Sequence, residues 1–326
     1  MRDGIVEQAG RFKKAIASKD TSSYKVVKKN QLVVGFPIDE GVIYVQNHDA
    51  PGIMSPAYNV WNIDLGRVDP SYLEFALHSP RSMAYYADKM RGTTARRRTL
   101  TADGLREMKI LLPSADGQIR VVNTLDEVRS LIEGANGQIA MLDTLVKSRF
   151  VEMFGDPISN SKGLETQPGS ALFKIVNGKT KPMDERYETG FPAYGGNGVS
   201  WYSQDSLVDF PTIVVGRVGR HCGNVHLVND PCWVTDNAMY IKRFHSNELD
   251  LIYLDELMRV VGFNRYADRG DLWKITQQPF MEFNYPMPPL AQQQELAAFV
   301  RQVDKSRFNL LKAYGSIIAL FRVLFP

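Results

Sequence analysis

The sequence predicts an α+β protein in which two mixed α/β domains alternate with two long, coiled-coil-like helices, as a tandem repeat with pseudo-two-fold symmetry. Three observations predict it: a strand, proline and helix pattern occurs twice, both helical segments carry apolar residues at heptad spacing, and the segments upstream of the helices also align. The helices are expected to pair antiparallel. The expected ranges are 1–116 and 155–289 for the domains, and 117–154 and 290–326 for the helices.

The heptads predict that each helix packs on another helix, because apolar residues recur every seven positions with a second row three or four residues away. The rows of the first helix are Leu125, Ile132, Ile139 and Val146, and Val121, Val128, Ala135 and Leu142. An offset of 178 positions leads to the rows expected in the second helix, which are Val303, Leu310, Ile317 and Leu324, and Ser306, Ala313 and Leu320.

The repeat extends into the mixed domains. Arg91-Gly92 aligns with Arg269-Gly270, again 178 positions apart, and an apolar strand that ends in glycine occurs in both halves, at Gly35 and at Gly216. A solenoid is excluded because its units have about 20 to 50 residues. Helices of about 35 residues reach roughly 50 Å, so we expect them to pair and to hold the two domains apart.

The composition excludes several classes of protein. The 326 residues contain 39 basic and 36 acidic side chains, so a nucleic-acid surface would have to come from local clustering. Two cysteines do not make a disulfide scaffold and fit a reducing cytosol. Because neither a signal-peptide core nor a stretch of about 18 apolar residues occurs, we expect a soluble cytoplasmic protein with no membrane partner.

The second domain contains glycine-rich turns with side chains suited to nucleic acid. Glycine permits close backbone approach, arginine can bind phosphate or guanine, and asparagine can read an adenine edge. Turns of this kind also occur with no binding role. The candidate DNA-binding residues of this domain are Lys179, Lys181, Tyr194, Asn197, Arg217, Arg220 and His221.

The first domain contains the densest basic cluster of the chain, "MRGTTARRRT". Phosphate contact is the use we expect for it, since such contacts position a protein on a duplex without specifying sequence. A solvated charged loop is the alternative. The candidate residues are Arg91, Thr93, Thr94, Arg96 and Arg97.

Catalytic motifs are weak throughout. The segment "NDPCW" at 229–233 resembles the tetrapeptide of amino-methyltransferases, but Cys232 replaces its second proline and no glycine-rich cofactor loop accompanies it. Cys222 and Cys232 lack the paired short spacings of zinc ligands. We therefore expect no catalytic residues, no metal and no cofactor on this chain.

With the repeat and the turns established, the chain resembles the specificity subunit of type I restriction-modification systems. The matching segments are "FKIVNGKTKP", "FPAYGGNGVSWY", "TIVVGRVGRHCGNVHLV" and "CWVTDNAMYI" in the second half, and "KKAIASKDTSSYKVVKKNQLVVG" and "GIMSPAYNVW" in the first. "PMPPLAQQQELAAFV" completes the pattern, so the resemblance covers essentially the whole chain.

The resemblance implies a non-catalytic DNA-binding subunit. Each target-recognition domain would read one half of a bipartite site on double-stranded DNA, while the helices would set the spacing and dock two methyltransferase subunits. S-adenosylmethionine would be bound by the partner methyltransferase for adenine methylation, and ATP and Mg by the motor and nuclease subunits. This chain would bind none of them.

The first domain differs from the family pattern in two ways. It lacks a counterpart of the segment "SALFKIVNGKTKP" that opens the second domain, so we expect an incomplete recognition domain that binds its half-site weakly or not at all. Phe36 occupies the position of Arg217, so the two domains are expected to read different bases.

Two other functions remain open from the sequence. One is a scaffold whose helices organise partner proteins while the turns are inert. The other is a fragment of an adenine methyltransferase built around "NDPCW". Binding of S-adenosylmethionine by the isolated chain would favour the fragment, and loss of DNA binding on replacement of Arg217 and Arg220 would argue against the scaffold.

Overall fold

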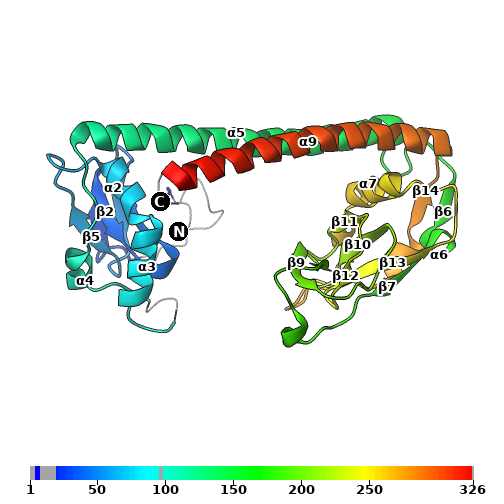
Figure 1. Ribbon diagram of the computed structural model, residues 1–326, viewed down its shortest axis with the longest axis horizontal. Coiled ribbons are helices and arrows are strands. Elements are labelled where there is room, and N and C mark those ends of the chain that lie inside the picture. Colours follow the sequence, from blue (N-terminus) through cyan, green and yellow to red (C-terminus); the bar gives the residue numbers. More distant parts are fainter. Residues whose placement is uncertain (1–3, 8–19, 95–97, 325–326) are drawn as a thin grey trace. The chain divides into compact units, whose positions relative to one another are not determined.

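The computed structural model describes residues 4–7, 20–94 and 98–324, with the backbone alone described for 316–324. The chain forms two compact units, Met1–Ile132 and Glu133–Pro326. The division falls within the first long helix, α5 (Ala115–Phe154; Figure 1). Among the described residues, no helix combines the length and the apolar character that a membrane span requires.

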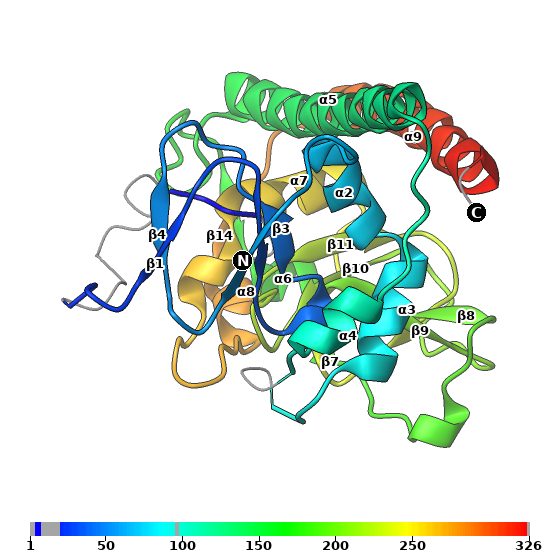
Figure 2. The ribbon, with the colours of Figure 1, turned by 90° about the vertical axis from the view of Figure 1, so that its left-hand side faces the viewer.

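The first unit contains two small antiparallel sheets. One has the order β3-β2-β5 and the other pairs β1 with β4, which lie side by side in Figure 2. In the three-stranded sheet the central Leu32 lies opposite Val45 on one side and Trp61 on the other. The strands are β1 (Lys25–Val27), β2 (Gln31–Val34), β3 (Ile43–Val45), β4 (Gly52–Met54) and β5 (Asn59–Asn62).

Side-chain caps begin the short helices of this unit. Asp69, Ser79 and Thr101 each accept a hydrogen bond from the backbone N–H three residues later, which satisfies an otherwise unpaired donor of the first turn. Proline at the first position of α2 and of α3 favours the same start. The helices are η1 (Ile38–Glu40), α2 (Pro70–Leu77), α3 (Pro80–Lys89) and α4 (Ala102–Glu107).

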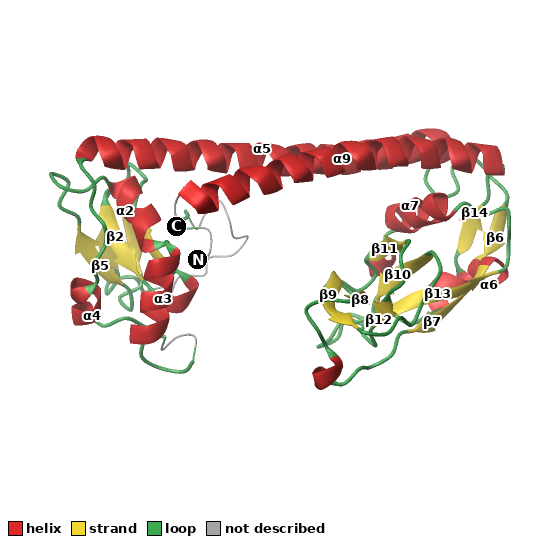
Figure 3. Cartoon of the chain, in the orientation of Figure 1, coloured by secondary structure: helices red, strands yellow, loops and turns green. Residues whose placement is uncertain are grey.

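The second unit contains a four-stranded antiparallel sheet of order β11-β10-β13-β7, visible in Figure 3. A three-stranded sheet, β12-β8-β9, and a pair, β14-β6, accompany it. The strands are β6 (Thr166–Pro168), β7 (Phe173–Asn177), β8 (Phe191–Gly195), β9 (Gly198–Ser203), β10 (Thr212–Gly216), β11 (Val225–Val228), β12 (Trp233–Val234), β13 (Ala238–Phe244) and β14 (Asn284–Pro286).

The C-terminal end of α5 and the N-terminal part of α9 lie in the core of the second unit. Phe150 and Phe154 of α5 and Leu296 of α9 are buried in the same cluster as the sheet and α7, and Tyr253 packs against both phenylalanines. The helices of this unit are α6 (Gly169–Leu172), η3 (Met183–Glu185), α7 (Leu251–Val261), η4 (Phe263–Tyr266), α8 (Gln278–Glu282) and α9 (Leu290–Leu324).

Strand order confirms that the mixed domains share one plan. The order β3-β2-β5 repeats β11-β10-β13, with Gly35 directly after β2 and Gly216 as the last residue of β10. The fourth strand, β7, has no counterpart beside β5 among the described residues of the first unit. Incompleteness of the first domain and weak binding by it both stay predictions.

Within the second unit, the C-terminal part of α5 and α9 run antiparallel. Arg149 Nη2 lies 2.9 Å from Glu295 Oε1, and further along the pair Arg307 Nη2 lies 2.5 Å from Asp143 Oδ1. As the position on α5 falls, the partner's position on α9 rises, which is the antiparallel direction. The two long helices, antiparallel over this part, are therefore confirmed.

The predicted rows of α5 are the less exposed positions of that helix, but the second row predicted for α9 is wrong. Ser306 and Ala313 are exposed, whereas Val303 and Leu310 lie in the seam, and the side chain of Ile317 lies outside the described part. The second row of α9 consists instead of Val300, Arg307 and Tyr314. A heptad cannot reveal this error, because a shift of three positions exchanges its two rows.

A repeated set of hydrogen bonds gives the true offset. Gln118 and Gln293, four residues into their helices, make matching contacts to Pro113 O and Pro288 O, at 3.0 and 2.8 Å. Both pairs are 175 positions apart, so Leu125 corresponds to Val300 and Ile132 to Arg307. We call the residues that join each mixed domain to its long helix the joint; the first joint is Arg67, Asp69, Tyr72, Leu111, Pro113 and Gln118, and the second is Glu248, Asp250, Tyr253, Pro286, Pro288 and Gln293.

Replacement of Phe150 tests whether the end of α5 belongs to the core. Phe150→Ala removes a fully buried ring and is expected to lower the free energy of unfolding by about 3–5 kcal/mol. Phe308→Ala is the matched control, because Phe308 is 65% exposed and its loss should have little effect. Urea unfolding followed by circular dichroism measures both, and equal losses would contradict this packing.

Candidate nucleic-acid interface

Two glycine-rich turns of the second unit meet at a backbone contact that leaves no room for a side chain at Gly216. Gly196 lies in the turn between β8 and β9, and Gly216 ends β10. A Cβ atom on Gly216 would lie 2.9 Å from Gly196 Cα and 2.2 Å from His221 O. Glycine at position 216 therefore permits the close approach that brings Asn197, on one turn, near His221, on the other.

The two turns line a hollow of about 550 Å³. Four of the predicted residues line it: Lys181, Asn197, Arg220 and His221. Asn197, Arg220 and His221 are exposed, so their polar groups are available to a ligand. The residues of the lining that the sequence analysis missed as candidates include Arg186, Ser200, Trp201, Asp236 and Asn237.

Arg186 and Trp201 are the clearest of the missed residues. The Arg186 guanidinium lies 5.3 Å from the centre of the Trp201 ring, which is a cation–π contact. The mixture of lysines, aromatic residues and glycines in this segment was the available signal, but spacing could not show that the two residues face one hollow.

A third turn lies beside the loop that follows β10. A bridge between Asp268 and Lys274 closes it, and Gly219 N donates a hydrogen bond of 2.8 Å to Trp273 O. Arg269 stacks over Trp273, 4.8 Å from the ring centre. The alignment of Arg269-Gly270 with Arg91-Gly92 was the signal that could have identified Arg269 as a candidate.

Lys181 has a structural role, because its ammonium group is bound by other side chains of the protein. Its side chain is 5% exposed, and Nζ lies 2.9 Å from both Ser203 Oγ and Asp205 Oδ2 and 4.3 Å from the centre of the Trp233 ring. The hydrogen bond with Asp205 raises the pKa of Lys181. Its charge is thus engaged within the protein, whereas Lys179 is exposed.

Arg217 lines a different hollow from Arg220. Its Nη1 donates a hydrogen bond of 3.0 Å to Asp236 O, and its side chain is partly buried. The hollow has a volume of about 490 Å³ and contains amide side chains, which can pair with adenine edges. Its lining is Asn177, Arg217, Thr276, Gln277, Gln278 and Met281.

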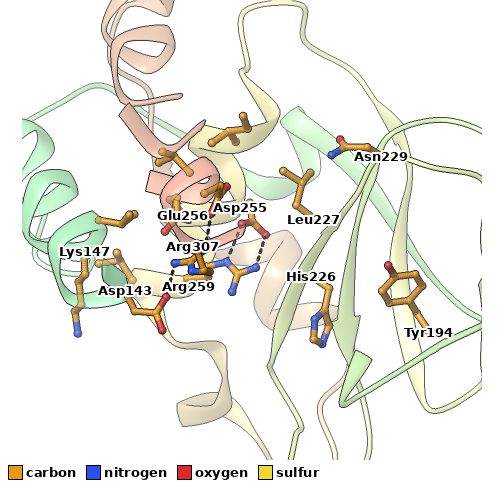
Figure 4. A pocket seen from close by; sticks show the side chains of 15 residues that line it. Asp143, Lys147, Tyr194, His226, Leu227, Asn229, Asp255, Glu256, Arg259 and Arg307 are labelled. Carbon is orange, nitrogen blue, oxygen red and sulfur yellow. Dashed lines mark hydrogen bonds and ion pairs between the residues drawn. The ribbon is translucent and has the colours of Figure 1, made fainter. Parts of the chain in front are cut away.

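Tyr194 belongs to the β8–β9 hairpin that carries Asn197, but it lines a different hollow, the charged one between α5, α7 and α9 shown in Figure 4. Burial raises its pKa. In the same hollow Arg259 Nε lies 2.7 Å from Asp255 Oδ2. Burial, followed by the charge of Asp255, raises the pKa of Glu256 to about 7. Tyr194 and Asn197 therefore line different hollows.

In the first unit the basic loop is closed by a bridge between Arg91 and Thr99. Arg91, Thr93 and Thr94 are exposed. Arg96 and Arg97 lie outside the described residues. The neighbouring Arg98 binds Asp39 and Glu40, the latter at 2.7 Å, so its charge is already paired.

Phe36, at the position of Arg217, packs on Tyr58 with 5.2 Å between the ring centres. The side chains at these equivalent positions therefore have different partners, an aromatic ring in one unit and a backbone carbonyl in the other. Different base preferences for the two domains stay a prediction.

The segment around Cys232 forms part of the fold. Cys232 is fully buried, it pairs with Val208 through backbone hydrogen bonds, and burial raises the pKa of its thiol to about 11. A thiol with this pKa is protonated at neutral pH and is a poor nucleophile. Within the described ranges, His, Cys, Asp and Glu side chains form no group of three that could hold a metal ion.

Comparison with known proteins finds one partial sequence match and solved structures with a similar fold. No family model matches the sequence. The specificity subunit of the type I restriction enzyme EcoprrI from Escherichia coli is 23% identical over 114 residues, which are 35% of this chain. The match spans about 28% of that curated relative's length.

Two solved structures share the fold over nearly the whole chain. The S subunit of a type I restriction-modification system from M. genitalium has a TM-score of 0.56 and 16% identity, with 98% of this chain and 90% of that chain covered. A structure described as the basis of complex assembly and conformational transition of the type I system has a TM-score of 0.51 and 17% identity, with 94% and 82% covered. The resemblance inferred from the sequence is therefore confirmed.

Replacement of Gly216 tests the contact between the turns. In Gly216→Ala the new Cβ would clash with backbone atoms, so the melting temperature is expected to fall by several degrees, as about 1–3 kcal/mol of overpacking would cause. Gly195→Ala is the control, since the nearest atom to its Cβ lies at 3.6 Å. Equal melting temperatures for the two variants would mean that the turns do not depend on this approach.

Glu256 makes stability depend on pH. Its pKa is about 7 in the folded chain against an ordinary 4.5, so the folded state holds a proton that the unfolded state releases, and stability falls as pH rises through this window. Glu256→Gln cannot ionise and should raise Tm at pH 8, with a gain that fades by pH 4.5. The exposed Glu188→Gln serves as control. A gain in Tm for Glu256→Gln that is the same at pH 8 and at pH 4.5 would refute the shifted titration.

Proposed function

We propose that this chain is the DNA-specificity subunit of a type I restriction-modification complex, with each mixed domain reading one half of a bipartite site. The observation that carries the proposal is the meeting of three turns on the second unit, two of which line one hollow. Cationic, amide and imidazole groups on these turns are the groups that contact phosphates and base edges in protein–DNA complexes.

Different residues would make different contacts. Arg220 is exposed and can hold a phosphate or the two acceptors of guanine, while Asn197 and Asn237 can pair with adenine. Lys181 would shape the surface from inside, because its ammonium is bound by Asp205. Arg91, Thr93 and Thr94 would contact phosphates from the first unit.

The long helices would set the spacing of the half-sites and dock two methyltransferase subunits. Several large apolar side chains are exposed on the helices of the second unit, and such patches are typical of protein–protein contact sites. A groove of about 580 Å³ lies between α5 and α9, lined in part by Leu142 and Leu310. These exposed residues include Met141, Leu145, Phe308 and Leu311.

The chain itself would be non-catalytic. S-adenosylmethionine would be bound by the methyltransferase subunits, and ATP and Mg by motor and nuclease subunits that join through the complex. The inert environment of Cys232 supports a structural role for the "NDPCW" segment. A scaffold that organises partner proteins is the second candidate function, favoured by the exposed apolar residues of the helices.

Replacement of Arg220 distinguishes DNA recognition from a scaffold. Arg220→Ala should weaken binding of the target duplex by about tenfold or more, because one base or phosphate contact contributes about 1–3 kcal/mol. Arg243→Ala is the matched control, since Arg243 is exposed on β13. Fluorescence anisotropy of the chain with its methyltransferase subunits measures the affinity, and equal affinities for the two variants would favour the scaffold.

A further inference from the structure

We propose that Gln118 and Gln293 are positioning residues that fix the gap between the two half-sites, an inference that rests on the proposed DNA recognition. Each glutamine would hold one recognition domain at a set angle on its own helix. A change of that angle moves the DNA-reading turns relative to the helix, and therefore changes which gap length the chain accepts.

Gln293 uses its whole amide to join three backbone segments. Its Oε1 accepts a hydrogen bond of 2.9 Å from Asp250 N, and its Nε2 donates to Glu248 O at 3.0 Å and to Pro288 O at 2.8 Å. The residue is 1% exposed. The Nε2 group thus has two acceptors, and all three bonds are buried from solvent.

Gln118 repeats the arrangement in the first unit. Its Oε1 accepts from Asp69 N at 2.8 Å, and its Nε2 donates to Arg67 O and to Pro113 O, both at 3.0 Å. The residue is 2% exposed. The same three contacts in two units of different sequence indicate that the connection itself is required.

The segments that the amide joins belong to the domain and to the helix. Asp69 and Asp250 are the N-caps of α2 and α7, which are part of the mixed domains, whereas Pro113 and Pro288 precede α5 and α9. Loss of the amide would leave a buried N–H and two carbonyl groups unsatisfied, a cost that the protein can reduce by letting the two parts move.

A tyrosine hydrogen bond lies close to each glutamine. Tyr72 OH donates to Leu111 O, in the segment that leads into α5, and Tyr253 OH donates to Pro286 O, the last residue of β14, each at 2.8 Å. In the first unit this bond is a further attachment of the domain to the segment before its helix, whereas in the second unit it lies within the mixed domain, two residues before Pro288. The glutamine bonds are therefore the attachment that both units share.

The two units differ in what else holds the helix. In the second unit Phe150 and Leu296 of the long helices belong to the core cluster of the mixed domain. In the first unit the core cluster of the described residues contains no residue of α5. Orientation in the first unit thus depends more heavily on its glutamine, so replacement of Gln118 should have the larger effect.

Selection from a random-sequence duplex library tests the proposal, with the full chain and its methyltransferase subunits. Gln118→Met and Gln293→Met keep the side-chain length and remove the hydrogen bonds. The preference for the best gap over gaps one base pair longer or shorter should fall about fivefold, the factor expected from one net hydrogen bond, while both half-site sequences stay the same. The exposed Asn123→Met and Gln294→Met are the controls.

The outcomes separate the inference from the proposed function. If the unaltered complex selects no split motif, the proposed function fails. If it selects one and the glutamine variants keep its gap preference, or fold but lose a half-site preference, the positioning role is overturned. Should Gln118→Met not fold, Gln118→Glu, which keeps the acceptor for Asp69 N, gives the same comparison, and a gap preference equal to that of the parent contradicts the role.

Discussion

A buried amide side chain joins each mixed domain to the start of its long helix, and the rest of the molecule depends on this connection. The N-cap of a domain helix, the residue two positions before that cap and the proline that precedes the long helix all bind the same glutamine, Gln118 in one unit and Gln293 in the other. These groups could not remain buried unpaired without a large loss of stability. The joint therefore turns a helix and a domain into one body with a defined angle.

Glycine supplies the other constraint, at the surface that would meet DNA. Gly196 and Gly216 approach so closely that the turns they belong to share one hollow. Exposed polar side chains then project from a backbone that close contact has already fixed. Recognition by this surface would use few charges placed well rather than a strongly basic face, which fits a net charge of +3.

The sequence predicted the order of the helices and strands better than the contacts of individual side chains. Apolar periodicity and prolines identified both long helices, and the glycine-terminated strands identified the common sheet order, since these features depend on local chemistry. The second row of α9 was predicted at the wrong positions, because a shift of the alignment by three residues exchanges the two apolar rows of a heptad and leaves the spacing unchanged. Separation of Tyr194 and Arg217 from Asn197, and the engagement of Lys181 by Asp205, depend on side-chain direction, which spacing does not report.

Mapping of methylated adenines in cells that express this chain with its methyltransferase subunits tests the central claim most directly. We expect a split motif whose two specific parts are separated by a non-specific gap of one length. A continuous motif, or methylation that does not change when this chain is removed, would contradict it.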